Sequence, residues 1–270
     1  MPQEKCCATR YPVLLVHGAF FRDVHWLSYW GRIPAALEQN GAAVYFGNQQ
    51  SAESVEASAA FLAGRIRAIL RETGSEKVNV IAHSKGGLDM RHAIAHCGIA
   101  GQVASLTTVS TPHRGCRYLD HLLHRLPQWV ISAIAAVYNI GMRLLGDPNP
   151  DFMAAIRDLT AEVCVPRDKQ LEIPEGILCR SVGTCLHRDR GARGFLRLTH
   201  GWVKKHDGEN DGLVGTHSMR WGQQFHLIEP TGKRGISHWD ATDLHRQRLD
   251  GFAPVEYYLK LVADLKKKGL

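Results

Sequence analysis

The segment 82–86, with the sequence Ala-His-Ser-Lys-Gly, constrains the fold of this chain more than any other segment. The apolar run 78–81 precedes it, and a helical pattern over 88–95 follows it. This order is typical of a sharp turn between a strand and a helix with a serine at its apex. The residues two before and two after that serine must be small, and alanine and glycine meet this demand. We therefore expect Ser84 to project its hydroxyl above the edge of a sheet.

Short apolar runs alternate with helical patterns along the chain. This β-α-β-α alternation predicts an α/β fold with a mostly parallel central sheet and helices on both faces. Functional residues of such folds gather at the carboxyl ends of the strands, where Ser84 is expected. A length of 270 residues fits one domain, 1–270, with an insertion. We expect strands over 13–16, 43–46, 78–81, 106–109, 177–182 and 225–228, and helices over 30–39, 53–71, 87–96 and 254–267.

The stretch 118–145 interrupts this alternation and predicts two helices separated by Pro127. Pro127 and Arg143 also make its apolar run too short to span a membrane. Its apolar stripes allow two interpretations, namely ordinary core helices or a helical lid above the site. In the second interpretation, substrate is expected to contact apolar side chains of this stretch and of the loop after the first strand: Phe20, Trp129, Val130 and Ile134.

The formal net charge is +7, and the basic residues are scattered. No nucleic-acid-binding motif accompanies them, so we expect a solvated basic surface rather than a nucleic-acid partner. Weak attraction to anionic interfaces is the alternative. The seven cysteines include no C-x-x-C pair, which argues against a structural zinc site and fits a reducing compartment. The first ten residues lack an apolar signal segment, so the chain is predicted to be cytoplasmic as it stands, or secreted if a signal was removed.

A serine hydroxyl becomes a good nucleophile when a histidine, oriented by a carboxylate, removes its proton. In a strand–turn–helix serine hydrolase the chain order is serine, acid, histidine. The segment 209–214 contains a polar turn before an apolar pair, and it favours Asp211 as the acid. Asp207 is the competing candidate, and a turn aspartate that bonds only its own backbone is the structural alternative.

For the base we choose His238, which lies in the late loop 235–240. His226 and His245 remain alternatives, because this chain has 15 histidines and most histidines are structural. The chain order and the loop position favour His238.

Two backbone N–H groups are needed to hold the oxyanion that forms during acyl transfer. One is expected from Lys85, directly after the serine and at the start of a helix. The other is expected from the loop 17–20 after the first strand, with Ala19 as first choice and Phe20 as second. His17 is expected to brace that loop.

Several segments resemble the bacterial true lipases of the Pseudomonas, Burkholderia and Proteus type, which have the α/β-hydrolase fold. The resemblance implies Ser84 as nucleophile, Asp211 as acid and His238 as base. It also implies Ala19 and Lys85 as oxyanion donors, a helical lid over 117–160, no cofactor for chemistry, and lipid esters such as acylglycerols as substrates, met at an oil–water interface. The similar segments are 11–18, 29–37, 77–87, 110–115 and 210–215.

The chain also departs from that family. Ala82 stands where many relatives have glycine, and the disulfide of some relatives has no match at 216–219. Many members bind a structural calcium through two aspartates. Asp240 matches one of them, but the second has only a loose match, Asp189, in a short basic segment, so the case for calcium is weak.

Two other functions compete with a lipase. A short-chain carboxylesterase or a polyester hydrolase would use the same residues, and the apolar stretch 118–145 favours the lipase over them. A non-enzymatic binding protein of the same fold would require a gap in the catalytic set, and the sequence shows none.

Overall fold

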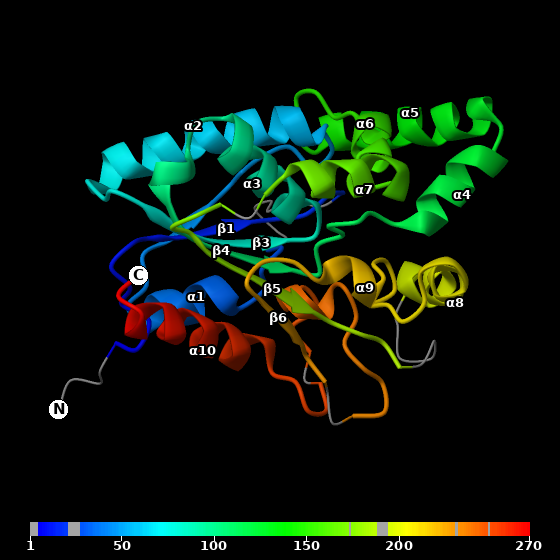
Figure 1. Ribbon diagram of the computed structural model, residues 1–270. Helices are drawn as coiled ribbons and strands as arrows, with labels where there is room; N and C mark the ends of the chain where they lie inside the picture. The colour runs from blue at the N-terminus through cyan, green and yellow to red at the C-terminus, as the bar shows by residue number, and fades with distance from the viewer. Residues whose placement is uncertain (1–4, 21–27, 173, 188–193, 230–231, 248) are drawn as a thin grey trace.

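The computed structural model describes residues 5–20, 28–172, 174–187, 194–229, 232–247 and 249–270. Its centre is a six-stranded sheet with the order β2-β1-β3-β4-β5-β6, in which every pair of neighbours is parallel (Figure 1). Each strand predicted from the sequence is present, which confirms the α/β fold. The strands are β1 Val13–Val16, β2 Val44–Phe46, β3 Val78–His83, β4 Val103–Val109, β5 Leu178–Gly183 and β6 Gln224–Leu227.

Helices cover both faces of the sheet (Figure 1). On one face lie α1 Ile33–Gln39 and α10 Pro254–Lys267, and on the other lie α2 Val55–Thr73 and α3 Lys85–His96. Side-chain alternation along β1 explains this layering. Val13 and Leu15 pack in the core cluster beneath α1 and α10, whereas Leu14 and Val16 pack in the cluster beneath α2 and α3.

The stretch after β4 forms two helices, α4 Arg117–Arg125 and α5 Gln128–Leu144, as the sequence predicts. Pro127 separates them, because its ring fixes φ and it has no N–H to continue α4. Two further helices follow, α6 Phe152–Arg157 and α7 Ala161–Gln170. Figure 1 shows α4 and α5 at the same end of the molecule as α8 Phe195–Asp207, and short α9 Thr216–Met219 follows α8.

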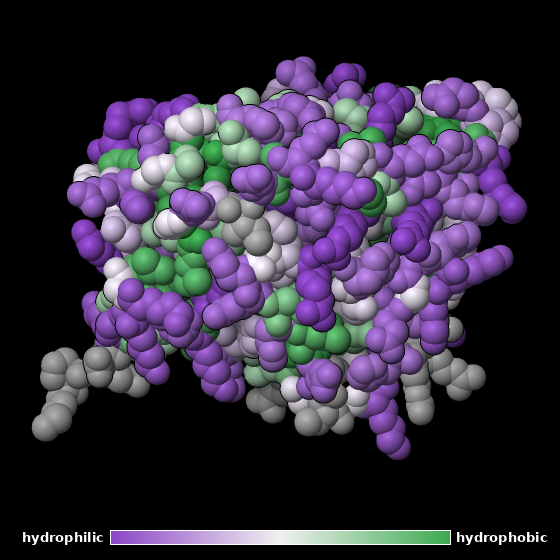
Figure 2. All heavy atoms as spheres, in the orientation of Figure 1, coloured by the Kyte–Doolittle hydropathy of each residue, from purple (hydrophilic) through white to green (hydrophobic). Residues whose placement is uncertain are grey.

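The helix α5 buries only a narrow stripe, which includes Ile131 and Ala135. Its outer face exposes large apolar side chains, including Trp129 at 74%, Val137 at 73% and Leu144 at 84% of their accessible surface. Figure 2 shows hydrophobic residues at the surface in the upper right, where Figure 1 places this helix. Within the part of the chain that the structure describes, none of the helices has the length and apolarity to cross a membrane.

Candidate active site

Ser84 sits at the turn between β3 and α3, with φ 55° and ψ −130°. A positive φ is costly for a residue with a Cβ and persists only where the surroundings impose it. The surroundings here are tight, since a Cβ built on Gly86 would lie 2.4 Å from the carbonyl oxygen of His17. A Cβ on Gly18 would lie 2.7 Å from the Cβ of Ser84. Glycine is therefore required at position 86 in the turn and at position 18 in the loop after β1. That loop passes directly beside the serine.

Asp211 and His238 form a buried pair. The Nδ1 of His238 lies 2.7 Å from the Oδ2 of Asp211, and the backbone N–H of His238 donates to the carbonyl of Asp211 at 2.9 Å. The Thr184 hydroxyl donates to the same Oδ2 at 3.3 Å. The other carboxylate oxygen accepts the backbone N–H groups of Leu213 and Val214 at 3.1 and 2.9 Å. Asp211 therefore both closes its own turn and orients the imidazole.

The competing residues occupy other places. Asp207 accepts the first N–H groups of α4, those of Arg117 and Tyr118, at 3.0 Å each. His226 stacks on Tyr257 of α10, with ring centroids 6.3 Å apart, and the ring of His245 packs against that of Trp239. Of the candidates weighed from the sequence, the structure joins only Asp211 and His238 in one pair.

Ser84 and His238 line one cavity of about 390 Å³, a size typical of small-molecule sites. Most of its other walls are apolar or aromatic. The loop after β1 contributes Ala19 and Phe20, and the stretch after β4 contributes Tyr138 and Phe152. Further side chains come from α4, from α8, from the loop before α9 and from the loop after β6. These are Leu119, Leu122, Phe195, Trp202, Leu213 and Trp239.

The predicted substrate contacts divide on this cavity. Phe20 lines it, but Trp129, Val130 and Ile134 do not; Ile134 is 49% exposed and Val130 half-buried. The face of α5 turned toward the cavity carries Tyr138. Trp129 lies on the opposite side of the helix from Tyr138, because successive residues are rotated by about 100°.

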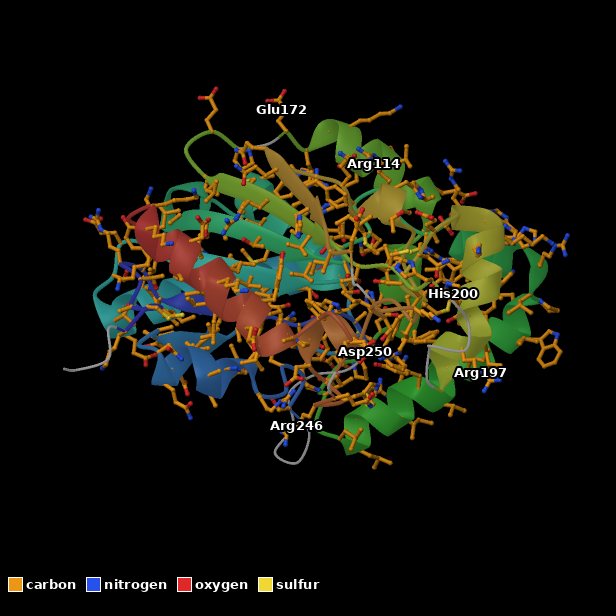
Figure 3. The ribbon with its side chains drawn as sticks, turned by 90° about the horizontal axis from the view of Figure 1, so that it is seen from below. Arg114, Glu172, Arg197, His200, Arg246 and Asp250 are labelled. Atoms are coloured by element: carbon orange, nitrogen blue, oxygen red, sulfur yellow. The ribbon has the colours of Figure 1, made fainter. Side chains whose placement is uncertain are left out.

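Sequence reasoning missed α8, which contributes Phe195, Thr199 and Trp202 to the wall. Its buried positions Leu196, Thr199, His200 and Val203 have the spacing of an amphipathic helix, which was a usable signal. Figure 3, seen from below, labels Arg197 and His200 on this helix. The buried His200 lies 3.3 Å from the carbonyl of Leu186 through its Nε2.

The structure separates the two oxyanion candidates in the loop 17–20. The backbone N–H of Phe20 donates to the carbonyl of Ser51 at 2.7 Å, so it is not directed at substrate. Ala19 lines the cavity beside Ser84, as its proposed role requires. His17 braces this loop as expected, since its two ring nitrogens lie 2.8 and 3.0 Å from the carbonyl oxygens of Gly18 and Gln49.

A buried hydrogen-bond chain joins the three segments of the site, and the sequence did not indicate it. The N–H of Gly18 donates to the Tyr29 hydroxyl at 2.9 Å, and that hydroxyl lies 2.6 Å from Nδ1 of His83. The Nε2 of His83 lies 3.1 Å from the carbonyl of His238. A carbonyl only accepts, so Nε2 carries the proton and Nδ1 accepts from Tyr29. Burial holds the pKa of His83 well below its usual value, which keeps the ring neutral.

Lys85, directly after the serine, does not line the cavity, and its side chain reaches from α3 to the Ser58 hydroxyl of α2 at 3.2 Å. Its Nζ lies 2.7 Å from Oδ1 of Asp89, and both side chains are buried. Burial raises the pKa of Asp89 to about 7, and the neighbouring Lys85 opposes that rise. Only the backbone of Lys85 is available to a substrate.

The carboxylate of Asp240, the predicted calcium ligand, is paired with a cationic side chain. Its Oδ2 accepts from the backbone N–H and the hydroxyl of Ser237 at 2.9 and 2.6 Å, and from Arg234 at 2.9 Å. A cation bound at Asp240 would share the carboxylate with the Arg234 guanidinium. Among the residues that the structure describes, no group of three or more His, Cys, Asp or Glu side chains could hold a metal ion. Asp189 lies outside the described residues.

Comparison with known proteins agrees with this geometry. The family model of palmitoyl protein thioesterases matches residues 12–145. A triacylglycerol lipase of Pseudarthrobacter phenanthrenivorans is 37% identical over 166 residues, and the match covers 57% of this chain and 51% of that protein. The chain thus spans about half the length of that relative. A triacylglycerol lipase of Vibrio cholerae is 29% identical over 301 residues, covering 100% of this chain and 92% of that protein.

The fold matches a solved structure over nearly its whole length. The mature lipase BlEst2 of Bacillus licheniformis superposes with a TM-score of 0.68 at 21% identity, covering 94% of this chain and 92% of that one. At this identity the superposition shows that the two chains share a fold. The chain is similar in sequence to bacterial triacylglycerol lipases and has the α/β-hydrolase fold.

Proposed function

We propose that this protein is a serine ester hydrolase with lipase character, in which Ser84 is the nucleophile, His238 the base and Asp211 the acid that orients it. The observation that carries the proposal is the 2.7 Å pair of His238 and Asp211 beside a cavity that Ser84 also lines. The names of the relatives support the same chemistry.

In the first half-reaction the Oγ of Ser84 attacks the carbonyl carbon of the ester, and Nε2 of His238 takes the hydroxyl proton. The backbone N–H groups of Ala19 and Lys85 hold the oxyanion of the tetrahedral intermediate. That intermediate collapses, and His238 gives its proton to the departing alcohol. Water then attacks the acyl-serine with His238 again as base, which releases the carboxylic acid. No step needs a cofactor.

The cavity supports esters with an apolar acyl chain as substrates, because most of the lining other than Ser84 and His238 is apolar or aromatic. The segment 117–160 would serve as a lid within the single domain 1–270, since α5 contributes Tyr138 to the cavity wall. The same helix exposes Trp129, Ile134 and Val137 outward. Such an exposed apolar face suits contact with an oil–water interface. Trp129, Val130 and Ile134 would then contact lipid at the mouth rather than inside the cavity.

The test uses the Ser84→Ala variant and a series of nitrophenyl esters from acetate to palmitate, presented below and above their solubility limits. We expect the wild type to hydrolyse them, with a rise in rate when an interface forms, and to be labelled by a fluorophosphonate. The variant should keep the Tm and lose both hydrolysis and labelling. Unchanged turnover by Ser84→Ala would refute the assignment of the nucleophile.

A second candidate substrate is a long-chain acyl thioester, favoured by the match to the palmitoyl protein thioesterase model over residues 12–145. Thioesters pass through the same acyl-serine, so the site itself does not separate the two. Assays with palmitoyl-CoA and nitrophenyl palmitate at equal concentrations separate the two substrate classes, because the ratio of the two kcat/KM values gives the preference of the protein. A short-chain esterase would instead prefer the soluble acetate or butyrate and gain nothing from an interface.

A further inference from the structure

The segment 49–52 after β2 lies between the oxyanion loop 17–20 and the segment 146–151 that follows α5. On the side of the oxyanion loop, the Phe20 N–H donates to the Ser51 carbonyl at 2.7 Å, and the Gln49 side-chain amide donates to the His17 carbonyl at 2.8 Å. The position of the oxyanion loop is therefore tied to this middle segment.

On the other side, the same segment is bound to the end of α5. The carboxylate of Asp147 accepts the Ser51 N–H at 2.9 Å and also the Ser51 hydroxyl. The Asp151 N–H donates to the Ala52 carbonyl at 2.8 Å. Ser51 and Asp147 are only 1% and 2% exposed. A charged carboxylate that is this buried needs its hydrogen bonds, because water cannot replace them.

Phe20 is held in a conformation that it would not adopt alone. Its φ is 72°, in the left-handed region that disfavours a bulky side chain. Its ring packs against Tyr138 of α5 and Phe152 of α6, with centroids 5.7 and 5.3 Å away. The hydroxyl of Tyr138 lies 3.2 Å from that of Ser51. Phe20 and Tyr138 thus contact each other through their rings, and each also contacts Ser51.

We propose that Ser51 and Asp147 are positioning residues that hold Phe20 strained and thereby keep the adjacent Ala19 N–H directed at the oxyanion. The segment 146–151 after α5 and the oxyanion loop share this connection, so a shift of that segment at Asp147 changes the geometry at Ala19. The inference rests on the proposed ester hydrolysis for its kinetic effect, but not for its structural effect.

Two variants test the connection. Asp147→Asn keeps the size but replaces one acceptor oxygen with a donor, and Ser51→Ala removes only the hydroxyl. Asp151→Ala is the matched control, because it keeps the backbone bond to Ala52 and removes only a side chain that caps α6 through the Ala154 N–H at 2.9 Å. With soluble nitrophenyl butyrate, we expect kcat of both test variants to fall about 10-fold with KM within twofold. This is less than the roughly 10²–10³-fold loss when a whole oxyanion donor is removed.

Hydrogen exchange gives the second readout. The amides of the peptide that contains residues 17–20 should exchange faster in Asp147→Asn than in the wild type or in Asp151→Ala. Unchanged kcat together with unchanged exchange overturns the proposal, and so does a rise in KM with kcat unchanged, which would assign these residues to substrate binding. If the wild type hydrolyses no ester, the proposed function fails and the exchange rates still decide the connection. A test variant that loses secondary structure by circular dichroism is replaced by the other one.

Discussion

Tyr29→Phe should destabilise the fold through the hydrogen-bond chain that joins the oxyanion loop to the His238 loop. The change removes one oxygen, which accepts from the Gly18 N–H at 2.9 Å and lies 2.6 Å from Nδ1 of His83. Tyr29 is 4% exposed and His83 fully buried, so water has little access to the groups left behind.

The magnitude follows from those two groups. A buried donor or acceptor that loses its partner costs about 1–3 kcal/mol, because it keeps the desolvation penalty without the bond. The N–H of Gly18 and the Nδ1 of His83 both lose their partner, so we expect a loss of about 2–6 kcal/mol of unfolding free energy. For a protein of this size that lowers the Tm by roughly 4–24 °C.

The chain offers a matched control in Tyr258. Both tyrosines are buried against Trp30, with ring centroids 5.6 and 5.9 Å from it. The Tyr258 hydroxyl, however, has no hydrogen-bond partner among the described residues. Tyr258→Phe removes an unsatisfied polar atom, so it should leave stability unchanged or raise it by up to about 1 kcal/mol.

The assay is urea unfolding followed by tryptophan fluorescence, with differential scanning calorimetry for the Tm. Equal stability of Tyr29→Phe and Tyr258→Phe would refute the reasoning, because the two changes remove the same atom from equally buried rings. If the hydrogen-bond chain through Tyr29 also positions the loops that carry the proposed catalytic residues, kcat of Tyr29→Phe falls and kcat of Tyr258→Phe does not.

Three further predictions concern the acid, the pH and the metal. Asp211→Asn should lower kcat by about 10³–10⁴ through the wrong tautomer of His238, whereas Asp207→Ala should lose only about 1 kcal/mol of stability from the start of α4; equal kcat losses would contradict the assignment. Burial lowers the pKa of His17, His83 and His113, so the unfolded chain binds more protons below about pH 6.5. Stability should therefore fall as the pH drops below that value, by up to about 1.4 kcal/mol per pH unit for each group, and a flat Tm between pH 7.5 and 5 would count against it. Excess EDTA should leave Tm and ester hydrolysis unchanged, and a fall restored by calcium would contradict this prediction and show that the protein binds the ion.

The sequence predicted the parts of the fold that depend on local pattern. The strands and the turn at Ser84 follow from short apolar runs and small residues, and Pro127 divides α4 from α5 by its own chemistry. The pairing of Asp211 with His238 followed from chain order and loop position, although neither measures a distance.

The rest depends on contacts between distant residues. Tyr29 and His83 are 54 positions apart, and nothing local marks a tyrosine as the partner of a histidine. Trp129 was predicted to contact substrate but does not line the cavity. An almost wholly apolar helix gives no sign of which face turns inward. Tertiary packing determines that Tyr138 is the residue of α5 that lines the cavity. In α8 the helical spacing of the buried residues Leu196, Thr199, His200 and Val203 was a usable local signal.

The strand order has a consequence for how the protein is made. The first four strands occupy adjacent places, and β5 and then β6 add in turn to one edge. A chain emerging from the ribosome can therefore complete the turn at Ser84 before His238, its proposed base, has been synthesised, since His238 follows β6. The nucleophile stays inert in that interval, because an unassisted serine hydroxyl is a weak nucleophile. On the proposed function, ester hydrolysis is then measurable only after synthesis is complete and β6 has added to the edge of the sheet. An N-terminal fragment that folds correctly would still hydrolyse no ester.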